Sequence, residues 1–119
     1  MNKDPIIFLQ HILNCIRRIE SFSKGMTKKR FESDEKTQSA IFRQIEIIGE
    51  AVKNLPIDYA VKYPHIEWAK IAATRNRLIH AYFEINLDLV WEMLEKDIPK
   101  LKKDILEIIK DLEIINEEL

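Results

Sequence analysis

Apolar residues recur along the last third of the chain at intervals of three and four residues. The positions are Val90, Leu94, Ile98, Leu101, Ile105, Ile108, Leu112 and Ile115. This spacing is close to a heptad and predicts a helix that packs along one side against other helices. Pro99 lies within the pattern, where a proline costs about 3 kcal/mol in a helix interior. We therefore expect either a kink at Pro99 or a new helix that has Pro99 in its first turn.

Three further helices are predicted from apolar stripes bounded by capping residues, proline or glycine. They run from Asp4-Pro5 to Gly25, from Ser33 or Asp34 to Leu55, and from about Ile66 to Tyr82, and Asn86 caps the fourth helix. No segment alternates with period two, and the two glycines and four prolines leave little material for turns. The sequence therefore predicts an all-α, up-and-down bundle of four main helices, built as a single domain over residues 1–119.

The segments between these helices carry three smaller expectations. Residues 26–35 are expected to form a polar connection with Phe31 tucked beneath it, and residues 57–63 a short helical turn. Gly49 lies inside the second helix, where glycine costs about 1 kcal/mol relative to alanine. A close approach by another backbone would explain its presence.

The charge balance does not identify a partner, because the formal net charge is -1. Residues 1–83 hold 14 Lys and Arg against 9 Asp and Glu, whereas residues 84–119 hold 5 against 11. A basic half suits a polyanion, although scattered Lys and Arg on solvated helices are the commoner explanation. The single cysteine, Cys15, excludes an internal disulfide, and the N-terminus shows neither a signal-peptide nor a transmembrane pattern. We expect a cytoplasmic protein without a membrane partner.

The stretch RNRLIHAYF, residues 75–83, gathers the residues best suited to chemistry. On a continuous helix Asn76 and His80 are one turn apart, and Arg75 lies about 140° around the axis from His80. Imidazole transfers protons near neutral pH, and guanidinium binds phosphate through paired N–H groups. Together they suit metal-free RNA cleavage, in which His80 takes the proton of a ribose 2′-hydroxyl and Arg75 stabilises negative charge. The amide of Asn76 would orient His80 or bind a phosphate oxygen.

Plainer interpretations stay open on these residues alone. An Arg-x4-His spacing arises easily in a charged helix, so the segment also fits a solvated face in which His80 is a hydrogen-bonded structural residue. No metal site is expected, because His11, His65 and His80 show no ligand spacing. The chain has no glycine-rich phosphate loop and no nucleophile elbow, and no cofactor is expected.

The chain resembles the HEPN superfamily, and within it the HepT-like toxins of prokaryotic toxin–antitoxin pairs. The motif of that family is Arg, a polar residue, three further positions, His, any residue and Tyr, which here spans Arg75 to Tyr82. Matching pieces surround it: IEIIGEA at 45–51, YPHIEWAKIA at 63–72 and VWEMLEKDIPKL at 90–101. The resemblance thus covers most of the chain in one order.

This resemblance implies a helical bundle that forms a homodimer, with the motifs of both subunits lining a shared basic cleft. It implies a metal-independent ribonuclease that acts on transfer RNA or messenger RNA, with no DNA target. Arg75 and His80 would be the catalytic pair and Asn76 their support. Weaker RNA contacts would come from Lys62, Lys70 and Arg77.

The resemblance also implies a regulatory partner, a cognate minimal nucleotidyltransferase antitoxin in a type VII-like toxin–antitoxin system. The antitoxin would silence the toxin by transferring AMP from ATP to Tyr82. A phosphodiester at that position would place negative charge against Arg75 and block RNA entry.

Two other functions remain open at this stage. One is a non-catalytic helical module that docks a nucleotidyltransferase and helps bind nucleotide or substrate. The other is a purely structural helical dimer in which the face of Asn76 and His80 is buried.

Overall fold

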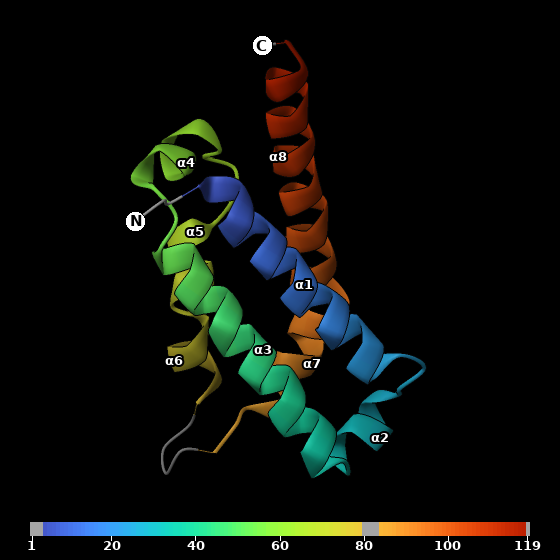
Figure 1. The fold of residues 1–119 in the computed structure, drawn as a ribbon. Coiled ribbons are helices and arrows are strands. Elements are labelled where there is room, and N and C mark those ends of the chain that lie inside the picture. Colours follow the sequence, from blue (N-terminus) through green and yellow to red (C-terminus); the bar gives the residue numbers. More distant parts are fainter. Residues whose placement is uncertain (1–3, 80–83, 119) are drawn as a thin grey trace.

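The computed structural model describes residues 4–79 and 84–118, with side chains described up to residue 113. The helices, in chain order (Figure 1), are α1 Pro5–Ser23, α2 Lys28–Glu32, α3 Glu35–Lys53, α4 Ile57–Lys62, α5 Trp68–Ala72, α6 Thr74–Leu78, α7 Leu87–Glu92, a π-helical turn Met93–Asp97 and α8 Ile98–Glu118. Within the described residues the only β-type pairing is an isolated antiparallel bridge. The all-α prediction is therefore confirmed.

The long helix α1 lies at the centre of the bundle and packs against both α3 and α8 (Figure 1). It begins as predicted, because the Asp4 carboxylate accepts the N–H of Ile6 at 3.1 Å and Pro5 occupies the first turn. Its buried stripe consists of Leu9, Ile12, Leu13, Cys15, Ile16 and Ile19. Burial raises the pKa of the Cys15 thiol, which makes it an unreactive core residue. Gly25 follows the helix with a φ of 71°, the left-handed conformation that glycine adopts without strain.

The expectation of a purely polar connection over residues 26–35 is wrong, because α2 forms within it. The hydroxyl oxygen of Thr27 caps α2 by accepting the N–H of Arg30 at 3.2 Å. Phe31 is fully buried, as predicted, and its ring centroid lies 5.6 Å from that of Trp91 in α7. One buried aromatic side chain therefore fastens this short helix to the bundle.

Helix α3 starts at the second of its two candidate caps. The Asp34 carboxylate accepts the N–H of Thr37 at 3.0 Å, and these hydrogen bonds hold the pKa of Asp34 below its ordinary value. Gln38 reaches back from α3 and donates to the carbonyls of Phe31 at 2.7 Å and Glu32 at 3.1 Å. The apolar stripe of α3, which is formed by Ile41, Ile45, Ile48 and Val52, is buried, and Leu55 is half-buried beyond the end of the helix.

The last helical run follows the second of the two expectations for Pro99. Asn86 caps α7 by accepting the N–H of Leu89 at 3.1 Å. The chain then widens into the π-helical turn, and α8 begins at Ile98 with Pro99 as its second residue. A proline has no N–H and its ring clashes with the carbonyl four residues earlier, so the turn before it cannot keep α-helical hydrogen bonding. No helix among residues 4–79 and 84–118 is both long enough and apolar enough to cross a membrane.

The predicted third helix, from Ile66 to Tyr82, is wrong as a continuous element. It is divided at Ala73 into α5 and α6, and helix geometry ends at Leu78. The hydroxyl of Thr74 donates to the carbonyl of Lys70 at 3.0 Å, the same carbonyl that the N–H of Thr74 would use in an unbroken helix. Before this segment, α4 confirms the short helical turn expected at residues 57–63.

The chain leaves α6 in an extended conformation. Ile79 has φ -99° and ψ 123°, and it pairs with Ile85 in the antiparallel bridge. The N–H of Asn86 donates to the carbonyl of Leu78 at 2.7 Å. The two described ends of the connection between α6 and α7 are therefore held side by side.

The anchoring of α2 generates a prediction for stability. Replacing Phe31 with alanine should lower the free energy of unfolding by about 3–5 kcal/mol, because a fully buried aromatic side chain leaves a cavity. Chemical denaturation measures the loss. The exposed neighbour Lys29→Ala is the control and should stay within about 0.5 kcal/mol of the wild type. Equal stability of the two variants would show that Phe31 does not anchor α2.

Candidate active site

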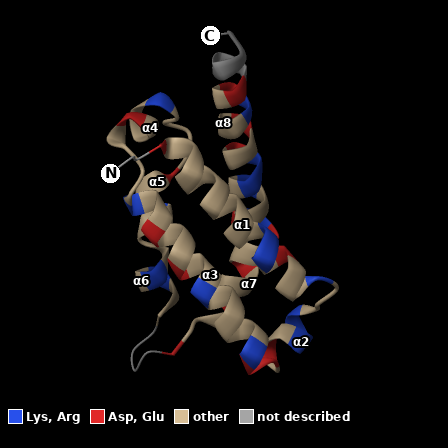
Figure 2. Ribbon diagram, viewed as in Figure 1, with Lys and Arg blue, Asp and Glu red and all other residues tan. Residues whose placement is uncertain are grey.

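Helix α6 carries the first half of the predicted motif. Its buried residues, Thr74 and Leu78, hold it against the core, and Leu78 is fully buried. The three residues between them, Arg75, Asn76 and Arg77, are exposed. Figure 2 shows this basic helix beside α3, which carries charges of both signs. Because the first and last residues of α6 are buried, the three residues between them are presented to solvent.

Arg75 is held by an ion pair that the sequence did not predict. Its Nε donates to Oε2 of Glu46 in α3 at 2.8 Å. The Glu46 side chain is 22% exposed and the Arg75 side chain 53% exposed. Among the described residues only Nε of Arg75 is used, so no described contact occupies the four N–H groups on the two terminal nitrogens, which can bind an anion. Arg43 lies at 4.0 Å from the other oxygen of Glu46 and adds a weaker contact.

The backbone of α5 lies close to α3 at Gly49, so the close approach expected there is observed. A Cβ atom at Gly49 would lie 3.4 Å from the carbonyl oxygen of Ala72 and 3.5 Å from that of Ile71. The end of α5 thus rests on α3 one turn beyond Glu46. This contact places the start of α6 close enough to α3 for the Arg75 side chain to reach Glu46.

Arg75 and Asn76 share a cavity of about 270 Å³ between α3 and the junction of α5 with α6. Its lining consists of Glu46, Gly49, Glu50, Lys53, Ala72, Arg75 and Asn76. Two carboxylates and two cationic groups therefore face it, and Lys53 lies 3.6 Å from Glu50. Within one described chain this cavity is balanced in charge, whereas the resemblance implied a basic cleft.

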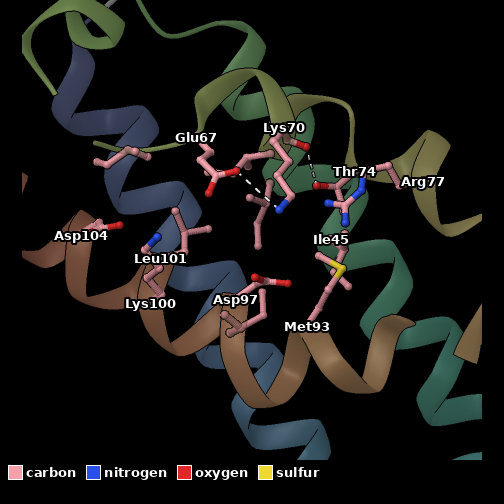
Figure 3. A pocket seen from close by; sticks show the side chains of 14 residues that line it. Ile45, Glu67, Lys70, Thr74, Arg77, Met93, Asp97, Lys100, Leu101 and Asp104 are labelled. Carbon is pink, nitrogen blue, oxygen red and sulfur yellow. Dashed lines mark hydrogen bonds and ion pairs between the residues drawn. The ribbon is translucent and has the colours of Figure 1, made fainter. Parts of the chain in front are cut away.

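Arg77 points to a different cavity from Arg75. Figure 3 shows Arg77 and Lys70 at the edge of a pocket between α3, α5 and the start of α8, with apolar side chains such as Ile45 and Met93 at its base. Lys70 is paired with Glu67 at 3.5 Å. The third predicted RNA contact, Lys62, lies in α4 with its ammonium 5.6 Å from the centre of the Tyr63 ring. The three candidate RNA contacts therefore do not line the cavity of Arg75.

His80 and Tyr82, the second half of the motif, lie outside the described residues. The end of α6 at Leu78 still corrects one step of the reasoning from sequence. The prediction of one continuous helix through this segment fails after Asn76, because Ile79 is already extended.

Sequence reasoning missed two groups of residues that the fold brings together. Glu46 meets Arg75 across 29 positions, and its signal was limited to the matching piece IEIIGEA. His65 meets Asp104 and Glu107 of α8, and the ligand atoms of the three lie within 4.8 Å of one another. Neither group has a local spacing that a single sequence reveals.

The fold and the partial site together define a class of protein. The all-α fold, with Arg75 and Asn76 exposed on α6, agrees with a HEPN-type domain. The chain belongs to the ribonuclease HepT-like family, whose profile matches residues 12–108.

Several relatives are closely similar over most of the chain. A "Gamma-glutamylcyclotransferase and putative RNase" of Methanocaldococcus jannaschii is 48% identical over 113 residues, which are 95% of this chain and 51% of the relative. The chain therefore spans about half the length of that relative. A "Putative RNase" of the same organism is 46% identical over 93% of this chain and 92% of its own.

A "Probable ribonuclease HepT" of Thermococcus cleftensis is 42% identical over 95 residues, or 80% of this chain and 86% of the relative. No solved structure matches the chain at a significant level. The family and the names of its members support a ribonuclease function.

Proposed function

We propose that this chain is a metal-independent ribonuclease in which Arg75 and His80 form the catalytic pair. The observation that carries the proposal is the ion pair of Arg75 with Glu46, at 2.8 Å through Nε. It orients the guanidinium while leaving the terminal nitrogens for a phosphate, which is the bidentate mode that arginine uses for this group. Membership of the ribonuclease HepT-like family supports the same activity.

In the proposed reaction the imidazole of His80 takes the proton of a ribose 2′-hydroxyl. The 2′-oxygen attacks the adjacent phosphorus, and the bond from phosphorus to the 5′-oxygen breaks. Arg75 stabilises the extra negative charge on the phosphoryl oxygens, and the leaving 5′-oxygen takes a proton from water. The products are a 2′,3′-cyclic phosphate and a 5′-hydroxyl. Asn76 lines the same cavity as Arg75 and is assigned to phosphate binding or to orienting His80.

The proposal includes a homodimer, because one cavity offers a single motif arginine to a phosphate. Glu46 and Glu50 offset Arg75 and Lys53 within one chain, which weakens attraction for a polyanion. A two-fold axis beside the cavity would bring a second copy of the motif to the same phosphate. We assign transfer RNA or messenger RNA as the substrate, with Lys62, Lys70 and Arg77 as more distant RNA contacts.

Regulation by an antitoxin is part of the same proposal. A minimal nucleotidyltransferase transfers AMP to Tyr82, as in a type VII-like toxin–antitoxin system in the cytoplasm. The added phosphodiester would compete with RNA phosphate for the free N–H groups of Arg75. Arg75 is half exposed and already oriented by Glu46, so it can accept this anion without rearrangement.

The charge-balanced lining of the cavity favours a second candidate function. A module that docks a nucleotidyltransferase without cutting RNA has no need of a basic cleft, and Glu46 and Glu50 are compatible with it. This alternative predicts formation of the complex and no cleavage by the isolated chain.

The test is cleavage of total transfer RNA in excess EDTA by purified dimeric protein, checked by intact mass for the absence of added AMP. The wild type should cleave, and His80→Ala and Arg75→Ala should each be slower by about 100-fold or more. His11→Ala and Arg30→Ala, which remove an exposed histidine and an exposed arginine elsewhere, should keep full activity. Absence of cleavage by unmodified wild-type dimer would favour the docking module.

Glu46 is a positioning residue for Arg75, and a double-mutant cycle tests this role. Glu46→Gln should lower the cleavage rate about 10- to 100-fold, because a loosely held guanidinium is misplaced at the phosphate. The same change in an Arg75→Ala background should have almost no further effect. Glu50→Gln is the matched control, since Glu50 lines the same cavity but pairs with Lys53. Additive losses for Glu46 and Arg75 would contradict the positioning role.

A further inference from the structure

A cluster of metal-binding side chains lies outside the proposed active site. His65 is in the connection between α4 and α5, whereas Asp104 and Glu107 are three residues apart on one face of α8. One ligand atom from each lies within 4.8 Å of the others. The Nε2 atom of His65 is 3.9 Å from Oδ1 of Asp104. Three donors of the types that bind transition metals thus converge from segments almost 40 residues apart.

Asp104 is the most enclosed of the three ligands. The residue is 9% exposed and its side chain 11% exposed, so its carboxylate keeps some contact with solvent. A largely enclosed carboxylate is normally paired or bound to a metal, and the contact found here among the described residues is the one with His65. The His65 ring is too distant, at 3.9 Å, to donate a hydrogen bond. Lys100, one turn earlier on α8, lines the same pocket but makes no ion pair with Asp104 among the described contacts.

We propose that His65, Asp104 and Glu107 bind a divalent transition-metal ion, for which Zn²⁺ is the best fit. One imidazole with two carboxylates is a zinc ligand set, and a fourth tetrahedral position stays free for water. Mg²⁺ and Ca²⁺ prefer sites made of oxygen alone, so the imidazole selects against them.

The side chains need little movement to reach the ion. Ligand atoms around a tetrahedral zinc lie about 3.3 Å apart, given bond lengths near 2.0–2.1 Å. The present separations of up to 4.8 Å require a shift of about 1 Å or more by some of them. His65 has a side chain that is 58% exposed, and Glu107 is exposed, so both are free to turn towards the buried Asp104.

The bound ion would tie the connection between α4 and α5 to α8. A neighbouring contact already joins the same two segments, because the hydroxyl of Tyr63 donates to Asp111 at 3.2 Å. Burial and the nearby Asp111 raise the pKa of Tyr63, which keeps this hydroxyl protonated as a donor. In Figure 3 Asp104 lies at the opposite end of the pocket from Arg77. The ion is therefore structural and takes no part in the proposed RNA chemistry.

Isothermal titration calorimetry of the full chain with zinc chloride tests the site, after EDTA treatment and its removal by gel filtration. We expect one Zn²⁺ per chain, with binding weakened about tenfold or more in His65→Ala and in Glu107→Gln. Both residues are exposed, so these variants should fold. His11→Ala is the matched control for loss of a histidine and should bind as the wild type. Saturating zinc should also raise the melting temperature of the wild type by about 5 °C or more, but not that of His65→Ala.

Three results would overturn the proposal: no binding of zinc by the wild type, equal binding by the wild type and His65→Ala, or equal binding of Mg²⁺ and Zn²⁺. None of them bears on the ribonuclease proposal, because RNA cleavage is assayed in EDTA. Conversely, an inactive protein that binds one zinc through these residues would support the metal site and contradict only the proposed function.

Discussion

The close contact between α3 and the end of α5 determines where the polar residues of the motif lie. The carbonyl oxygen of Ala72 lies 3.4 Å from where a Cβ atom of Gly49 would be, at the near limit of ordinary van der Waals contact. The helix then breaks at Ala73, and α6 starts beside α3 instead of continuing past it. Arg75 is the second residue of α6 and reaches Glu46 at 2.8 Å. The position of the proposed catalytic arginine therefore depends on the packing of α5 against α3 at Gly49, one turn beyond Glu46.

The break at Ala73 also separates the two arginines of the motif. Arg75 lines the cavity of α3 with Glu46 and Glu50, whereas Arg77 and Lys70 line the pocket between α3, α5 and the start of α8. A single chain thus offers one oriented guanidinium in a charge-balanced cavity. The proposed homodimer would bring a second motif arginine to the same phosphate, and the proposed AMP on Tyr82 would compete with RNA for these guanidinium groups.

Much of the fold could be predicted because helix periodicity and capping are local signals. The stripes of α1, α3 and α8, the caps Asp4 and Asn86, and the restart of the helix at Pro99 all follow from neighbouring residues. The helix α2 was not predicted in its connection, although threonine is a preferred N-cap residue. Thr27 caps α2 by accepting the N–H of Arg30.

The parts of the site that could not be predicted depend on tertiary contacts. The break at Ala73 arises from the hydroxyl of Thr74, which takes the Lys70 carbonyl, and helical propensity alone favours continuity there. The pairs Arg75–Glu46 and His65–Asp104 join residues 29 and 39 positions apart. A single sequence does not show which distant residues lie close together, so these pairs can be identified only in the folded structure.

The measurement that tests the central claim most directly is cleavage of an RNA oligonucleotide that carries one 2′-O-methyl group. The modified nucleotide precedes the phosphate that the wild type cuts in the unmodified oligonucleotide. If the 2′-oxygen is the nucleophile activated by His80, cleavage at that phosphate should be abolished while the unmodified RNA yields a 2′,3′-cyclic phosphate. Cleavage of the modified RNA at an unchanged rate would contradict the account, because the attacking group would then be water.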